Sequence, residues 1–272
     1  WTRHFDLTYP VRNPSAWMAA ERELKSSLSF LTGDTYAFQF PERKGIAPHK
    51  KSRLVLQPVF DAVCLFSGGV DSLCGAWQLL QAGKKVLLVG HQADGTTAAA
   101  QKEIFEGLNS VFPGRALLLQ IRVSRAGGAN PRFRLPDKIE QTHRPRSFLF
   151  LALAVAIAKV AKVSEIFIPE NGLIALNAPL QISRQGTLST RTVHPAFLLR
   201  FLDFCRKMKL FVGSLRNPFL YLSKTDVIGM NCDSKILRKM LLRSVSCARP
   251  SLYQNKGVRH CGYCVPCLYR RS

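Results

Sequence analysis

Apolar and polar residues occur in two kinds of spacing along this chain, and together these patterns predict an α/β fold. From about residue 58, short uninterrupted apolar runs, typical of buried strands, alternate with longer stretches of helical spacing. The predicted strands are 61–66, 85–91, 116–123 and 165–169, and the predicted helices are 71–80, 96–111 and 146–162. This alternation favours a parallel sheet wrapped by helices. Ligands bind such sheets at the carboxyl ends of strands, so the candidate site is formed by the loops after Phe66, His91, Val123 and Pro169.

Two further segments flank this α/β region. An N-terminal α+β appendage is predicted over 1–57, with a strand at 5–9, a helix at 14–31 and a strand at 35–40. Basic, Gly- and Pro-containing sequence predicts a connector at 44–53, and a Gly-, Pro- and Arg-rich stretch predicts a loop at 124–138. We therefore divide the chain into 1–57, an α/β domain at 58–240 and a cysteine-rich C-terminal segment at 241–272.

The loop after the first α/β strand has the composition of a phosphate site. Its residues are Ser67, Gly68, Gly69, Val70, Asp71 and Ser72. Glycines let the backbone approach an anion closely, and the N-terminus of the following helix adds about half a positive charge. Asp71 would act by holding Mg²⁺ and, as an acid at a helix start, would stabilise the fold only mildly. The loop has no Lys and lacks the Walker A spacing, which excludes P-loop kinases and GTPases.

Half of the eight cysteines gather near the C-terminus. They are Cys247, Cys261, Cys264 and Cys267. A Cys-x-x-Cys turn brings two thiolates to one ion, and the other two can complete a tetrahedron. Four thiolates suit structural Zn²⁺ or an iron–sulfur cluster, and free thiols are the remaining alternative. The clustering indicates metal binding rather than a disulfide framework, so we expect a reducing, cytoplasmic location.

Composition and charge exclude some classes of protein and indicate which binding partners are possible. The apolar content of 47% and the aromatic content of 10% exclude disorder of the whole chain. No apolar run reaches the roughly 18 residues that span a bilayer, so we expect no membrane insertion. The formal net charge is +22, from 39 Lys and Arg residues against 17 Asp and Glu residues. A nucleic acid, an anionic substrate, and a basic surface beside an acidic partner protein all fit this charge.

The strand–loop–helix sequence around 67–72 resembles the signature of the PP-loop (N-type) ATP pyrophosphatases. The resemblance implies a Rossmann-like domain of the adenine nucleotide alpha hydrolase type, with helices on both faces of its sheet. Such a domain cleaves ATP between the α- and β-phosphates and adenylates a substrate. The six loop residues would then cradle the pyrophosphate portion of ATP, and Val89 and His91 would lie beside the adenine. Attack on the α-phosphate requires that charge on the leaving pyrophosphate be neutralised, which suits this loop.

Three further stretches narrow the resemblance to the 7-cyano-7-deazaguanine synthases, the QueC family. They are the Ser246-Cys247 pair with the three later cysteines, the Arg144-Pro145-Arg146-Ser147 stretch, and residues 217–228. The resemblance covers 60–267 and implies Zn²⁺ at the four cysteines, ATP with Mg²⁺, and a 7-carboxy-7-deazaguanine-type substrate. The N-terminal appendage and the segment 169–195 depart from the short QueC enzymes. Both look more like the QueC-like proteins of anti-phage systems, such as QatC of the Qat system.

The segment that follows the strand at 165–169 supplies candidate substrate contacts. A carboxylate and an amide directly after this strand offer acceptors and donors suited to a purine-like base edge. Arginines can bind a substrate carboxylate or the ATP phosphates, and a lysine can stabilise charge on the α-phosphate. The candidate substrate contacts are Glu170, Asn171, Arg144 and Arg191, and the candidate catalytic residues are Asp71, Lys224 and Arg146.

These features favour an ATP-dependent, ligase-like enzyme. It would adenylate the carboxylate of a deazapurine-like molecule, release pyrophosphate, and transfer the acyl group to ammonia or to an amine on a macromolecule. Two alternatives stay open: a PP-loop tRNA-modifying enzyme, and a non-catalytic ATP-binding subunit of a defence complex with a protein partner. A tRNA thiolation enzyme also requires a sulfur-relay cysteine, and Cys74 and Cys232 form no evident Cys-x-x-Cys pair.

Overall fold

The computed structural model of this chain describes most of the predicted elements. The described residues are 2–45, 59–92, 94–123, 145–176, 191–231, 234–247, 260–264 and 266–268. Several sequence predictions lie outside them, namely the loop at 124–138, most of the connector at 44–53, Arg144 and Cys232. No described helix has the length and apolar character that a bilayer span requires.

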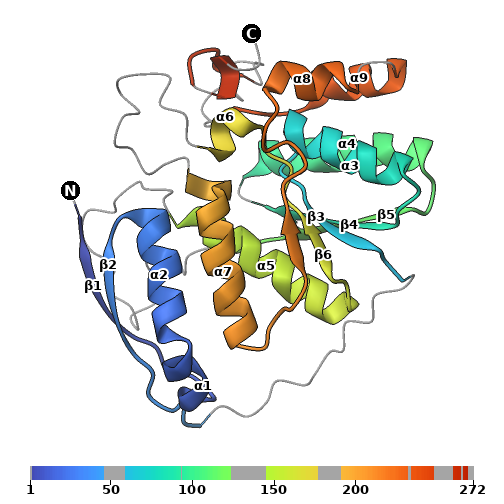
Figure 1. Cartoon of the computed structure of the whole chain (residues 1–272). Coiled ribbons are helices and arrows are strands. Elements are labelled where there is room, and N and C mark those ends of the chain that lie inside the picture. Colours follow the sequence, from blue (N-terminus) through green and yellow to red (C-terminus); the bar gives the residue numbers. More distant parts are fainter. Residues whose placement is uncertain are drawn as a thin grey trace.

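The α/β region is built on one five-stranded parallel sheet with the order β5-β4-β3-β6-β7 (Figure 1). The strands are β3 (Ala62–Leu65), β4 (Val86–His91), β5 (Ala116–Ile121), β6 (Glu165–Phe167) and β7 (Ser214–Arg216). The chain runs outward from β3 to β5 and then returns to place β6 on the other side of β3. The crossover direction therefore switches between β3 and β6, and ligands bind doubly wound sheets at such a switch. The predicted α/β fold class is confirmed.

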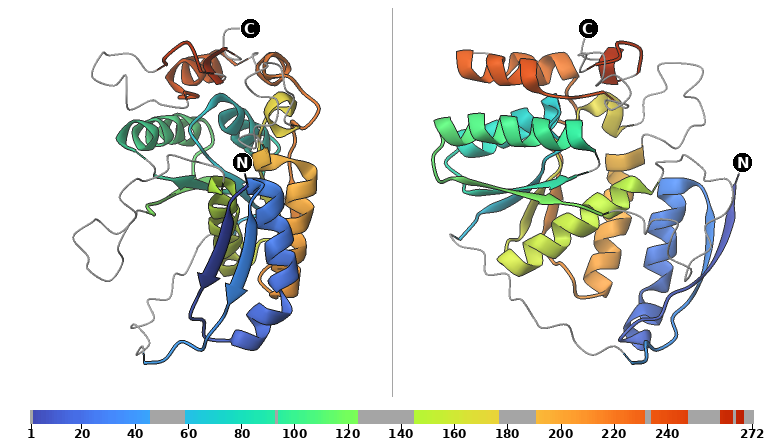
Figure 2. Two further views of the ribbon diagram at one scale, coloured as in Figure 1. Left: turned by 90° about the vertical axis from the view of Figure 1, so that its left-hand side faces the viewer. Right: turned by 180° about the vertical axis from the view of Figure 1, so that it is seen from behind.

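Helices cover both faces of this sheet, as the two views in Figure 2 show. On one face lie α3 (Val70–Gln81) and α4 (Gly95–Val111), and α8 (Lys224–Gly229) and α9 (Lys235–Arg243) pack on the outer side of these two helices. On the other face lie α5 (Arg146–Ala161) and α7 (Pro195–Lys207). The alternation of strand side chains explains this arrangement. Val63 and Leu87 pack in the same core as Leu151 of α5, whereas their neighbours Cys64 and Leu88 pack with α3 and α4.

The N-terminal unit forms a second, two-stranded parallel sheet. Its elements are β1 (His4–Thr8), α1 (Pro14–Ala19), α2 (Glu21–Thr32) and β2 (Thr35–Gln39). The single helix predicted at 14–31 is therefore wrong in one respect, because the helix is interrupted at Ala20. α2 lies along α7, and Leu24 and Leu31 share a buried core with Phe197 and Phe204 (Figure 1). The unit is thus fixed to the α/β region through an apolar interface.

Candidate active site at the topological switch point

The glycine-rich loop is a tight turn from β3 into α3. Gly68 has a φ of +80°, which favours glycine, and a Cβ there would lie 3.2 Å from the backbone nitrogen of Gln101. The Gly69 N–H donates to Ser67 Oγ at 3.2 Å, and Ser67 Oγ lies 3.1 Å from Ser72 Oγ. α3 begins at Val70, so its N-terminus opens at the carboxyl edge of the sheet beside these hydroxyls. This arrangement suits an anion.

Asp71, in the loop after one strand, contacts residues from the loops that follow two other strands at this edge of the sheet. Its carboxylate is buried, and Oδ2 accepts hydrogen bonds from the backbone N–H of Asn171 at 3.2 Å and from Asn171 Nδ2 at 2.6 Å. Its Oδ1 lies 3.5 Å from the buried Nζ of Lys224 and has no hydrogen-bond partner among the described residues. The loops after β3, β6 and β7 thus meet at one ion pair. Three residues predicted from sequence, Asp71, Asn171 and Lys224, are brought together here.

Glu170 stands beside this ion pair. Its backbone is held by Asn217, which accepts from the Glu170 N–H at 3.2 Å and donates from Nδ2 to the Glu170 carbonyl at 2.8 Å. Asn171 Nδ2 lies 3.5 Å from Glu170 Oε1, so one amide lies between the carboxylates of Glu170 and Asp71. Burial, and then the negative charge of Asp71, raise the pKa of the Glu170 carboxyl well above its usual value. The site therefore favours a cation or a proton between these acids.

Mg²⁺ fits the donor set of this site. Carboxylate oxygens are ligands that Mg²⁺ prefers, and Asp71 Oδ1 is a buried acceptor to which no described residue donates a hydrogen bond. Lys224 supplies the positive charge that faces this oxygen in the structure. An arriving Mg²⁺ would share Asp71 with that ammonium group.

A second polar group lies at the end of β4, where the adenine is expected. The ring of His91 packs 5.3 Å from the ring of Phe150, and His91 Nδ1 is buried without a partner among the described residues. The Arg146 guanidinium lies 5.1 Å from the same phenyl ring. Burial, and to a smaller extent the charge of Arg146, lower the pKa of His91. Val89 is buried in β4, and no ion pair or hydrogen bond joins Arg146 to Asp71 within the described part of the chain.

Arg191 contacts the N-terminal unit. It belongs to the short 3₁₀ segment η2 (Arg191–Val193), and its Nη1 donates to the Phe30 carbonyl at 2.9 Å. Its guanidinium lies 5.0 Å from the Phe30 ring, and Arg200 lies 4.7 Å from the same ring. Phe30 is in α2, so these contacts attach α2 to the segment that precedes α7. The described residues show no hydrogen bond or ion pair from Arg191 to Asp71, Asn171 or Lys224.

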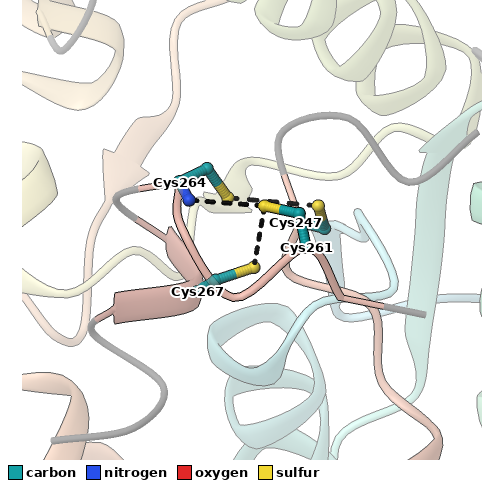
Figure 3. A group of neighbouring side chains, drawn as sticks. All are labelled: Cys247, Cys261, Cys264 and Cys267. Carbon is teal, nitrogen blue, oxygen red and sulfur yellow. Dashed lines mark hydrogen bonds between the residues drawn. The ribbon is translucent and has the colours of Figure 1, made fainter. Parts of the chain in front are cut away.

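The four C-terminal cysteines form a compact group, drawn in Figure 3. All four sulfurs lie within 4.8 Å of one another, and the Cys261–Cys267 and Cys264–Cys247 sulfur pairs are 3.9 and 4.0 Å apart. Four sulfurs around one Zn²⁺, with Zn–S bonds of about 2.3 Å, would lie about 3.8 Å apart. An iron–sulfur cluster is larger than one ion and separates its cysteine sulfurs more widely. The observed spacing therefore fits a single tetrahedral ion.

The thiols of this group differ in acidity. Cys261 Sγ accepts from the backbone N–H groups of Tyr263 at 3.5 Å and Cys264 at 3.3 Å, and these bonds lower the pKa of its thiol to about 6. Burial raises the pKa of the Cys267 thiol to about 12. Metal ligation requires thiolates, and backbone N–H groups aimed at a sulfur stabilise that form.

Sequence reasoning missed Gln101 beside the phosphate loop. Gln101 is fully buried, and its Nε2 lies 3.4 Å from both the Ser67 and His91 carbonyls, while its Oε1 accepts from Gln120 at 3.0 Å. It thereby ties the loop after β3 to the end of β4. A signal was present, because Gln101 is a polar residue on the stripe of α4 that buries Ile104 and Leu108.

Comparison with known proteins gives a weak structural likeness. No family model matches the sequence, and no curated protein sequence matches it. One similar solved structure is the U34-tRNA thiolase NcsA from Methanococcus maripaludis with its [4Fe-4S] cluster, at 12% sequence identity. That alignment covers 90% of this chain and 84% of the thiolase chain, with a TM-score of 0.30.

Proposed function

We propose that this chain is a PP-loop ATP pyrophosphatase that adenylates a carboxylate, as QueC-like enzymes do. The observation that carries the proposal is the ion pair of Asp71 with Lys224, which Asn171 also holds, directly beside a glycine-rich loop at the switch point. An ATP bound at this loop would have its α-phosphate near the ends of β6 and β7. A second substrate could meet it there without leaving the sheet edge.

Each part of the site has a role in this proposal. The loop from Ser67 to Ser72 would bind the pyrophosphate portion of ATP through N–H groups and hydroxyls. Asp71 would hold Mg²⁺, which neutralises phosphate charge when bound. Lys224 would stabilise negative charge that develops around the α-phosphate. His91 and Val89 would contact the adenine, and Nδ1 of His91, which has no hydrogen-bond partner in the described part of the chain, could bond to it.

The second substrate is proposed to be a 7-carboxy-7-deazaguanine-type molecule. Its ring N–H and amino group are donors that the Glu170 carboxylate could accept, with Asn171 beside it. Its carboxylate oxygen would attack the α-phosphate and expel pyrophosphate, which leaves an acyl adenylate. A nitrogen nucleophile would then attack the acyl carbon and expel AMP. Arg144 and Arg191 remain candidate substrate contacts, and the resemblance to anti-phage QueC-like proteins extends the proposal to a role in defence.

The test is to identify the products of ATP. We would incubate the protein with ATP, Mg²⁺ and 7-carboxy-7-deazaguanine and separate the nucleotides. AMP and pyrophosphate are the expected products, whereas ADP and phosphate would contradict α–β cleavage. The variant Asp203→Asn should form the same products as the wild type at an unchanged rate, because Asp203 is an exposed acid on α7. ATP binding without any turnover would favour the non-catalytic subunit instead.

A tRNA-modifying enzyme is the second candidate, and the outer face of α9 favours it. The exposed residues of this helix are Lys235, Ile236, Arg238, Lys239, Leu242 and Arg243, of which four are basic and none is acidic. Such a face suits RNA phosphates, and binding would weaken steeply with salt. Against thiolation, the described cysteines outside the metal group, Cys64, Cys74 and Cys205, are all buried. RNA binding titrated at several salt concentrations separates this candidate from the first.

A further inference from the structure

The metal-binding segment reaches into the phosphate loop, although the two are far apart in sequence. The Val245 N–H donates to the Gly68 carbonyl at 2.8 Å. The Val70 N–H donates to Ser246 Oγ at 3.3 Å across a separation of 176 residues. Cys247, one of the four clustered cysteines, is the next residue in the chain. The segment that leads into the metal site therefore makes two hydrogen bonds to the phosphate loop.

Ser246 is held in this place from both sides by the metal-binding segment. Its backbone N–H donates to His260 Nε2 at 3.3 Å, and His260 directly precedes Cys261. Cys247 follows Ser246, with its sulfur 4.0 Å from that of Cys264. An ion bound by these sulfurs would hold Cys247, which follows Ser246, and Cys261, which follows His260. The position of its hydroxyl would then depend on the ion.

The Ser246 hydroxyl lies where a phosphate oxygen would be recognised. A Cβ on Gly69 would lie 3.3 Å from both Ser246 Oγ and Ser67 Oγ, so two hydroxyls flank this glycine. Ser246 Oγ accepts from Val70, the first residue of α3, and its own hydrogen has no described acceptor. A serine hydroxyl that accepts one hydrogen bond can still donate another. Its free donor is thus available to an anion at the helix N-terminus.

We propose that Ser246 completes the phosphate site, so that ATP affinity depends on occupation of the four-cysteine metal site. This inference rests on the proposed function, because it takes the loop to bind ATP. The hydroxyl would donate to the pyrophosphate portion of ATP and keep the Val70 N–H in position. Coupling between two binding sites is reciprocal, so bound nucleotide should also protect the metal.

The test compares Ser246→Ala with Ser244→Ala in metal-loaded protein. The ligand is the α,β-methylene analogue of ATP with Mg²⁺, which resists cleavage, and the readout is its dissociation constant. Ser246→Ala should weaken binding about tenfold or more through loss of a charge-assisted hydrogen bond. Ser244 is the matched control, because it is buried and its hydroxyl donates to the Leu241 carbonyl at 2.6 Å, away from the loop. Ser244→Ala should lower thermal stability and leave the affinity unchanged.

A second arm removes the metal with a zinc-selective chelator and checks secondary structure by circular dichroism. Stripped wild-type protein should bind the analogue as weakly as Ser246→Ala does, and the two changes should not add. Bound analogue should raise the chelator concentration that removes half of the metal from the wild type, but not from Ser246→Ala. Equal affinity of metal-loaded wild type and Ser246→Ala would overturn the inference and leave the proposed function standing. A wild-type protein that binds no analogue would overturn both.

Discussion

Replacement of Asp71 by Asn should destabilise the fold strongly. The variant keeps the shape of the side chain and an oxygen that can accept from Asn171, but it removes the charge that faces Lys224. Asp71 and Lys224 are only 6% and 5% exposed, so water screens this pair little. Breaking a buried pair from one side costs about 3–5 kcal/mol, so Asp71 should stabilise the fold more than the mild effect expected from its place at a helix start. Glu170 can ionise more readily once Asp71 is neutral, because the charge of Asp71 helps to raise its pKa, and this places the loss near the lower end.

Urea denaturation followed by circular dichroism measures this loss. Lys224→Met should be destabilising as well, and the double variant should lose less than the sum of the two, since neither charge is then left unpaired. Asp203→Asn is the control, because its exposed pair with Arg206 is worth about 1 kcal/mol at most. A loss below about 1 kcal/mol for Asp71→Asn, together with additive single variants, would refute the assignment of a stabilising buried ion pair.

Three other predictions concern the metal, the substrate and the turn. Elemental analysis should find one zinc per colourless chain; Cys267→Ser should lose it, and the buried Cys205→Ser should retain it. Deazaguanine affinity should rise as pH passes upward through the raised pKa of Glu170, because the ionised carboxylate accepts two donors; Glu170→Gln should bind about ten- to a hundredfold more weakly and lack this dependence. Gly68→Ala should lower the unfolding free energy by about 1–2 kcal/mol or more. This loss should be larger than that of Gly114→Ala, because Gly114 has a similar φ but a Cβ there would meet open space.

The α/β core was predictable because its strands are continuous apolar runs. Each predicted strand of the core contains an observed one, and the helices predicted at 71–80, 96–111 and 146–162 differ from α3, α4 and α5 by at most one residue at each end. β7 was not predicted, because it consists of three partly exposed residues, Ser-Leu-Arg, in which no alternation can be recognised. The break at Ala20 was also missed, since the apolar spacing continues through it.

The site was predictable only where the fold itself assembles it. Asp71 and Asn171 each follow a predicted parallel strand, so the rule on strand ends and switch points brings them together. Lys224 was a candidate for its charge alone, and the strand before it, β7, was not predicted. Gln101 and Ser246 lie within or after a helix rather than at a strand end, and their side chains act through contacts 34 and 176 residues away. Asn217 directly follows β7 and was missed because that strand was not predicted. The pattern around each is compatible with an ordinary polar residue. Such positioning contacts become visible only with the tertiary structure.

The two basic residues predicted to be catalytic, Lys224 and Arg146, lie at two different ends of the site. Lys224 pairs with Asp71 at the ends of β3 and β6, where the glycine-rich loop would bind pyrophosphate. Arg146 packs on Phe150, whose ring also contacts His91 at the end of β4. If the adenine lies beside β4, a nucleotide extended toward the loop would place its base near Arg146 and its phosphates near Lys224. The charge of Lys224 is therefore the better placed to act on the α-phosphate, and Arg146 is better suited to bind the nucleoside.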